Sequence, residues 1–134
     1  IVMSVVPGKS GQKYIEETHA KMSGLNSILQ QHNFSGYIEA DGGVNLENIG
    51  SVFADGARAF VGGGAIIAQQ DVRIAIREFR DEVLKSRRGL LLDKANELGG
   101  SDLVNKWIGL HVIGEKQEQI KKIAKEVGYI WMNQ

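Results

Sequence analysis

Three apolar runs of this chain each end in a loop that contains at least two glycines. The runs cover residues 1–6, 37–41 and 57–61, and the loops that follow cover 7–12, 41–44 and 61–64. Runs this short, bounded by glycine or proline, predict strands, and strands that alternate with helices indicate a parallel α/β sheet. The loops after parallel strands lie at one edge of the sheet, where exposed backbone N–H groups can bind a phosphorylated ligand. This pattern constrains both the fold and the place of a site.

Helical spacing predicts what lies between and after these strands. Apolar residues recur at intervals of three or four within residues 14–31, and a short helix is expected at 46–54 with Asn45 as its N-cap. Asp71 is the predicted cap of a long helix that ends near residue 88. We expect residues 1–88 to form the βα units. We expect residues 89–134 to form a C-terminal extension packed on the same domain, with a helix at 90–98, a strand at 107–113, a helix at 116–127 and a strand at 129–132.

Length and composition limit the classes of function. A chain of 134 residues can bury the core of one domain. Its formal net charge of zero gives no argument for a nucleic acid or a membrane as partner. It has no cysteine, which excludes a thiolate nucleophile and thiolate metal ligands. We expect a cytoplasmic protein. Because the chain opens on Ile1 inside a predicted strand, we also expect that an N-terminal part is missing.

One carboxylate stands out at the predicted edge. Asp41 ends the second strand, directly before two glycines. From the residues alone it can ligate a metal ion, act as a general acid or base, or cap the following turn. The glycine pairs can equally be phosphate-binding loops or ordinary tight turns. His19 and His32 are expected to face solvent, and the role of His111 stays open.

Three motifs in order resemble one family. Met3-Ser4-Val5 followed by Pro7-Gly8-x-x-Gly11-Gln12-Lys13 resembles the sixth-strand segment of ribulose-phosphate 3-epimerases. The segments 38–45 (IEADGGVN) and 60–66 (FVGGGAI) are similar to the seventh and eighth. The resemblance covers about residues 1–87. It implies a TIM (βα)₈ barrel of the ribulose-phosphate-binding type, of which this chain is the C-terminal part, a partial barrel with a C-terminal extension.

The resemblance also implies an activity and its residues. The family interconverts D-ribulose 5-phosphate and D-xylulose 5-phosphate at C3, through an enediolate, with two acid/base carboxylates and a divalent metal (Zn, Fe, Mn or Co). Asp41 is then both a catalytic acid/base and a metal ligand. Met3 lines the pocket. The residues that bind substrate or phosphate are Gly8, Lys9, Ser10, Gly11, Gly42, Gly43, Gly63 and Gly64.

Departures from the family pattern leave alternatives open. Lys9 and Ser10 stand where the family loop has Phe and Gly, and Gly63-Gly64 stands where it has Gly-Ser. The family's other metal ligands and its second acid/base group lie on early strands, and no matching segment precedes Ile1. The chain alone is therefore expected to be inactive. It can instead be a non-catalytic phosphosugar-binding or interaction module, or part of an epimerase for another ketose phosphate. A homo-oligomer, or association with the missing N-terminal half, is expected.

Overall fold

The computed structural model describes residues 1–97. The strands are β1 (Val2–Met3), β2 (Ile38–Asp41) and β3 (Ala57–Val61), and the helices are α1 (Thr18–Gln31), α2 (Ile49–Ala54), α3 (Gly63–Ile67) and α4 (Val72–Glu97). The elements predicted at 107–113, 116–127 and 129–132, together with His111, lie outside the described residues. No helix within residues 1–97 has the length and apolar character to cross a membrane.

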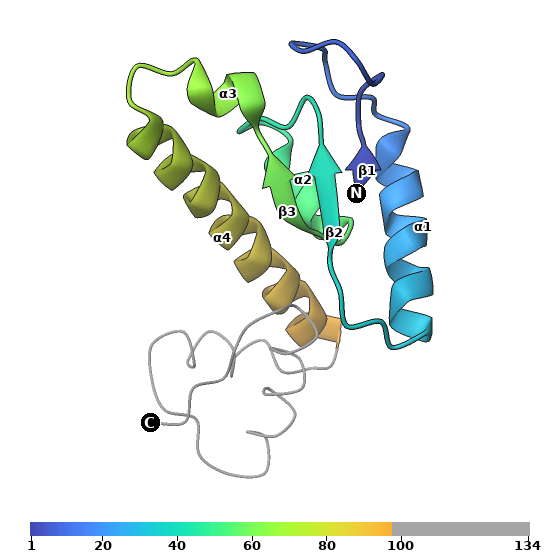
Figure 1. Cartoon of the computed structure of the whole chain (residues 1–134). Helices are drawn as coiled ribbons and strands as arrows, with labels where there is room; N and C mark the ends of the chain where they lie inside the picture. The colour runs from blue at the N-terminus through green and yellow to red at the C-terminus, as the bar shows by residue number, and fades with distance from the viewer. Residues whose placement is uncertain (98–134) are drawn as a thin grey trace. The chain divides into compact units, whose positions relative to one another are not determined.

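The three strands form one parallel sheet in the order β1-β2-β3 (Figure 1). Met3 pairs with Asp41, and Asp41 pairs in turn with Val61. This confirms the predicted parallel α/β architecture. The closed eight-stranded barrel stays a prediction, because these residues supply three strands.

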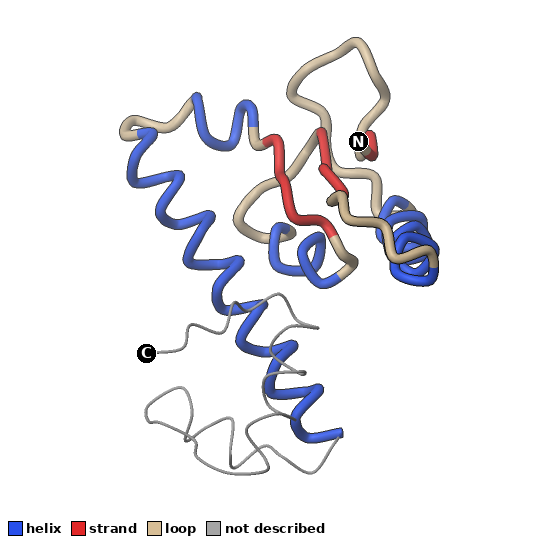
Figure 2. Tube along the Cα trace, turned by 60° about the horizontal axis from the view of Figure 1, so that its bottom comes forward, coloured by secondary structure: helices blue, strands red, loops and turns tan. Residues whose placement is uncertain are grey.

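Helices cover one face of this sheet. Figure 2 shows α1 and α2 together on one side of the strands. Met22 of α1 and Val52 of α2 are fully buried against Ala40 of β2, and Phe79 of α4 joins the same cluster. Because side chains alternate along a strand, the neighbours of these core residues lie on the other face. Met3 and Val61 there keep 39% and 40% of their surface exposed.

The first βα unit differs from its prediction at both ends. β1 is Val2–Met3 rather than residues 1–6, and α1 begins at Thr18 rather than at residue 14. The backbone leaves the ladder at Ser4, whose carbonyl accepts a hydrogen bond from Ile15 N–H at 2.9 Å. Residues 14–17 are held by this contact and precede the helix.

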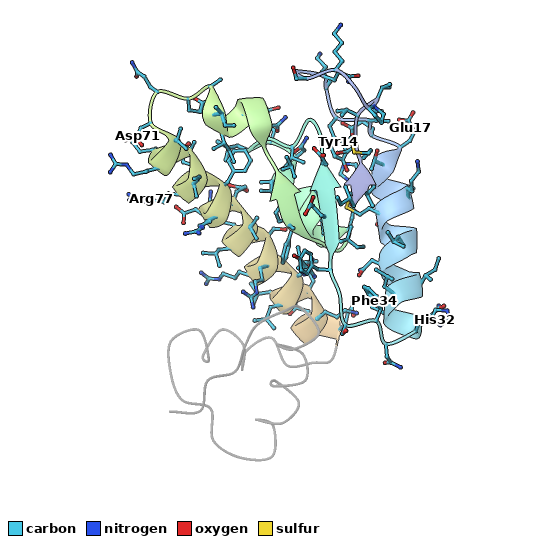
Figure 3. The ribbon with its side chains drawn as sticks, in the orientation of Figure 1. Tyr14, Glu17, His32, Phe34, Asp71 and Arg77 are labelled. Atoms are coloured by element: carbon cyan, nitrogen blue, oxygen red, sulfur yellow. The ribbon has the colours of Figure 1, made fainter. Side chains whose placement is uncertain are left out.

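The later helices also differ in their bounds. Asn45 caps a turn, accepting the Glu47 N–H at 2.8 Å, and α2 begins only at Ile49. α3 follows β3 with only Gly62 between them, so part of the loop predicted at 61–64 is helical. The predicted cap at Asp71 is confirmed, since its carboxylate accepts the Arg73 N–H at 2.8 Å. Figure 3 labels Asp71 at the start of α4.

The predicted end near residue 88 of the helix that Asp71 caps is wrong, and residues 90–97 of the helix predicted at 90–98 belong to the same helix. α4 runs without a break from Val72 to Glu97. A single internal glycine, Gly89, costs a helix only about 1 kcal/mol, which strong helix formers on both sides offset. The chain divides into two compact units, Ile1–Ser86 and Arg87–Gln134. The site described next lies in the first unit.

Candidate active site

The centre of the site is a row of three side chains across the sheet. Met3, Asp41 and Val61 are register partners on adjacent strands, so their side chains lie on the same face. The row lies at the carboxyl ends of β1, β2 and β3. Ser4 N–H donates to the Asp41 carbonyl at 2.8 Å, which fixes the end of β2 against β1.

A cleft of about 330 Å³ opens over this row. All three glycine loops reach it. Its lining includes every site residue predicted from the sequence: Met3, Gly8, Lys9, Ser10, Gly11, Asp41, Gly42, Gly43, Gly63 and Gly64. The structure therefore brings a carboxylate and the glycine backbones to a single place, the arrangement that a site for a small anionic ligand needs.

The loop after β1 arches at the mouth of the cleft. The Gln12 side-chain amide donates to the Val6 carbonyl at 2.6 Å and to the Lys9 carbonyl at 2.7 Å. These two hydrogen bonds hold both sides of the loop together. Lys9 lies exposed on it, so the loop presents a positive charge beside the cleft.

The loop after β2 accepts only glycine. Gly42 and Gly43 have φ of +114° and +67°. A Cβ on Gly42 would approach the Val5 side chain to 2.3 Å, and one on Gly43 would approach the Tyr14 backbone N to 2.4 Å. The two glycines therefore let β1 and its loop lie directly against this turn.

Side chains hold both carbonyls of this turn. The Gly42 carbonyl accepts a hydrogen bond from Ser4 Oγ at 2.6 Å, and the Gly43 carbonyl accepts one from Asn48 Nδ2 at 3.0 Å. The direction of each following peptide N–H is thereby set, because the peptide unit is planar.

The loop after β3 is the most open. Gly63 and Gly64 form the first turn of α3, and a Cβ on either would meet no atom within 4 Å. The first N–H groups of a helix have no partner inside the helix. Both glycines can thus offer backbone donors to a ligand in the cleft.

The described residues do not by themselves form a metal centre. Among the residues of the described part that line the cleft, Asp41 is the only carboxylate. Residues 1–97 contain no cluster of three or more His, Cys, Asp or Glu side chains able to hold an ion. A catalytic zinc site has three protein ligands, so Asp41 can supply one of a set and the present donors do not complete it.

The prediction that His19 faces solvent is wrong. His19 Nδ1 bonds Asp55 Oδ2, and Ser23 Oγ donates to Asp55 Oδ1 at 2.8 Å. His19 and Ser23 lie four residues apart on α1, hence on one face of the helix. That spacing is a signal for a shared partner, but the sequence did not identify Asp55. His32 is exposed, as predicted.

Tyr14 packs against the loop after β2, where its backbone lies next to Gly43. Figure 3 labels it near the carboxyl ends of β1 and β2. Its ring lies 4.9 Å from that of His19, and its buried hydroxyl has no hydrogen-bond partner within the described part of the chain. Burial, and then the carboxylates of Asp55 and Glu16, raise the pKa of Tyr14 to about 12.

Comparison with known proteins points to one family. The model of the ribulose-phosphate 3-epimerase family matches residues 1–67. Over 85 residues the chain is 40% identical to a ribulose-phosphate 3-epimerase of Escherichia coli, covering 63% of this chain and 38% of that protein. It is 33% identical over 95 residues to the ribulose-phosphate 3-epimerase of Methanocaldococcus jannaschii, covering 71% and 41%. A chloroplastic ribulose-5-phosphate-3-epimerase of Arabidopsis thaliana is 38% identical over 77 residues, covering 58% and 27%. The chain thus spans about two fifths or less of the length of these relatives.

Proposed function

This chain belongs to the ribulose-phosphate 3-epimerase family, and we propose that it supplies the phosphate-binding loops and one acid/base group of a ketose-phosphate 3-epimerase. The substrate pair is D-ribulose 5-phosphate and D-xylulose 5-phosphate. The observation that carries the proposal is the common cleft, in which Asp41 and the glycine loops lie together.

The chemistry follows from what these groups can do. The glycine N–H groups bind the phosphate of the ketose and fix its position over the sheet. The C3–H lies next to the C2 carbonyl and is acidified by it. Asp41 exchanges a proton with C3 on one side of the substrate as the enediolate forms or collapses. Inversion at C3 needs a second acid/base group on the opposite side, which lies outside the described residues that line the cleft.

A divalent metal would stabilise the negative charge of the enediolate when bound. Asp41 would provide one ligand, and the remaining ligands would come from outside residues 1–97. The proton transfer that we propose for Asp41 does not depend on which residues hold the metal.

The test is the rate of epimerisation in the intact protein. Asp41→Asn keeps the shape of the side chain and removes its acid/base function, so kcat should fall about 10²- to 10⁴-fold. Asp81→Asn, at an exposed aspartate of α4, is the matched control and should keep the wild-type rate. Epimerisation by Asp41→Asn at the rate of the wild type would rule the proposal out.

A non-catalytic module is the second candidate. It is favoured by the single carboxylate among the described cleft residues. Calorimetric titration of this chain with D-ribulose 5-phosphate and Zn²⁺ separates the two. Binding of the sugar phosphate without metal uptake or turnover in the intact protein would support the module.

A further inference from the structure

We propose a positioning role for Ser4, the serine that follows β1. Its hydroxyl orients the Gly42–Gly43 peptide so that the Gly43 N–H points into the cleft and can donate a hydrogen bond to a phosphate. The inference deepens the proposed function, because it rests on the phosphate lying at the Gly42–Gly43 turn. Ser4 itself does not contact the phosphate.

Ser4 is fully buried and forms three hydrogen bonds. Its N–H donates to the Asp41 carbonyl at 2.8 Å, its carbonyl accepts from Ile15 N–H at 2.9 Å, and its hydroxyl donates to the Gly42 carbonyl at 2.6 Å. A buried hydroxyl needs a partner, and here that partner is the turn beside Asp41. One residue thus holds the strand end, the approach to α1 and the glycine turn in a fixed relation.

The consequence for Gly43 follows from peptide geometry. The Gly42–Gly43 peptide is trans, so the Gly42 C=O and the Gly43 N–H point in opposite directions. Ser4 holds the carbonyl on the buried side, and it does not line the cleft, whereas Gly42 and Gly43 do. The Gly43 N–H is therefore turned away from Ser4, and within residues 1–97 it has no hydrogen-bond partner.

The Ser4 hydrogen bond matters because two adjacent glycines give the Gly42–Gly43 peptide little intrinsic resistance to a flip. Both residues are glycines at positive φ, and glycine has the widest backbone freedom of any residue. Without the Ser4 hydroxyl the peptide can flip and present its carbonyl oxygen to the cleft, where it would repel a phosphate. An anion donor works best when its direction is fixed before the ligand arrives.

The experiment compares three Ser4 forms with a matched control in the intact protein. Ser4→Ala removes the hydroxyl, and Ser4→Cys keeps the size and supplies a weak donor. Ser86→Ala is the control, since Ser86 Oγ likewise donates to a glycine carbonyl, that of Gly50, at 2.8 Å, and neither residue lines the cleft. The probe is inorganic phosphate, followed through the ¹⁵N–¹H signal of Gly43, with KM and kcat for D-ribulose 5-phosphate measured alongside.

We expect Ser4→Ala to raise the Kd for phosphate about tenfold, the size of one hydrogen bond, and to abolish the phosphate-induced shift of Gly43. KM should rise by a similar factor with kcat nearly unchanged, because phosphate binding acts alike on ground and transition states. Ser4→Cys should lie between, and Ser86→Ala should match the wild type. The remaining amide signals of each variant report whether it is folded.

The outcomes separate the two ideas. A Ser4-dependent phosphate shift in a protein that does not epimerise would end the proposed function and keep the role of Ser4. Wild-type phosphate affinity and an unchanged Gly43 shift in folded Ser4→Ala or Ser4→Cys would overturn the role of Ser4, even in an active epimerase. A wild-type protein in which phosphate leaves the Gly43 signal unmoved would overturn the role of Ser4 and the placing of the phosphate at this turn, and would leave the acid/base role of Asp41 to its own test.

Discussion

At the scale of single residues, the two glycine pairs of the cleft have different reasons for being glycine. A Cβ at Gly43 would meet the Tyr14 backbone, whereas a Cβ at Gly64 would meet nothing within 4 Å. Gly43 is also at positive φ, and Gly64 lies in a helix. The fold requires glycine at the first position, whereas no contact within residues 1–97 requires it at the second.

This difference predicts opposite effects on stability. Gly43→Ala should lower the free energy of unfolding by about 2 kcal/mol, from the left-handed backbone and the clash with backbone atoms. Gly64→Ala should keep or raise it by up to about 1 kcal/mol, because alanine favours the helix. Urea unfolding followed by circular dichroism measures both. Equal losses in the two variants would contradict the geometry of the turn.

Tyr14 predicts a dependence of stability on alkaline pH. An unfolded tyrosine ionises near pH 10, whereas the folded pKa of Tyr14 is about 12. Between these values the unfolded state has already lost its proton and the folded state has not. The contribution of Tyr14 to stability is therefore complete below pH 10 and is lost as pH rises toward 12.

The comparison variant is Tyr14→Phe. It keeps the ring and removes a buried hydroxyl without a partner in residues 1–97, so its stability at pH 7 should equal or exceed the wild type by up to about 1 kcal/mol. Its stability should also fall less between pH 10 and 12. Tyr37→Phe, at an exposed tyrosine, is the control and should follow the wild type. Parallel pH curves for Tyr14→Phe and the wild type would exclude the assigned cause.

Residue types at strand ends were enough to predict the lining of the cleft. Asp41 and the glycines follow three predicted strands, and parallel strands bring such positions to one edge. Ser4, Asn48 and Gln12 were missed. Each acts through a backbone carbonyl whose direction depends on the folded turn, and no spacing in the sequence encodes that direction.

At the scale of elements, a polar cluster joins α1 to the turn between α2 and β3. Asp55, at the end of α2, bonds His19 and Ser23 of α1, and the side chains of His19 and Asp55 are only 26% and 19% exposed. Partly buried hydrogen bonds of this kind stabilise more than exposed ion pairs do.

We expect His19→Ala to lower the free energy of unfolding by about 1 to 2 kcal/mol. A double-mutant cycle with Asp55→Ala should give a coupling energy above about 0.5 kcal/mol. Lys85→Ala breaks the exposed pair with Glu82 and should cost less than about 0.5 kcal/mol. Additive effects of His19→Ala and Asp55→Ala would show that the cluster does not join the two elements.

The type and order of the strands and of α1, α2 and α4 could be predicted, whereas α3 and the bounds of the elements could not. Apolar spacing identified the three strands and the helices between them, because burial of one face dictates that spacing. The end of β1 depends on Ser4 and Ile15, and the start of α2 depends on the turn that Asn45 caps. The end placed at residue 88 failed because helix propagation across Gly89 outweighs the local cost of one glycine.

At the scale of the whole molecule, the face of the sheet opposite the helices bears on how the chain associates. Met3 and Val61 are two fifths exposed on the face opposite the helices. Parallel sheets in proteins are normally covered on both faces. This is the face that carries the cleft, and we keep the prediction that this chain self-associates or binds a partner there, so that the partner would complete the walls around the cleft.

Sedimentation velocity at micromolar concentrations checks this prediction. The wild-type chain should show concentration-dependent association, and Val61→Lys should weaken it by placing a charge on the open face. Ile28→Lys changes an exposed apolar residue of α1 and should leave association unchanged. A monomer at all concentrations, or equal effects of the two lysines, would count against the face as an interface.

The most direct test of the whole account is hydrogen exchange at C3 of the sugar. The intact protein is incubated with D-ribulose 5-phosphate in D₂O, and deuterium at C3 is measured by NMR for the wild type and for Asp41→Asn. We predict deuterium at C3 with the wild type and a loss of at least about 10²-fold in its rate with Asp41→Asn. Exchange at the wild-type rate in Asp41→Asn would contradict the claim that this carboxylate, placed among the glycine loops, moves the proton.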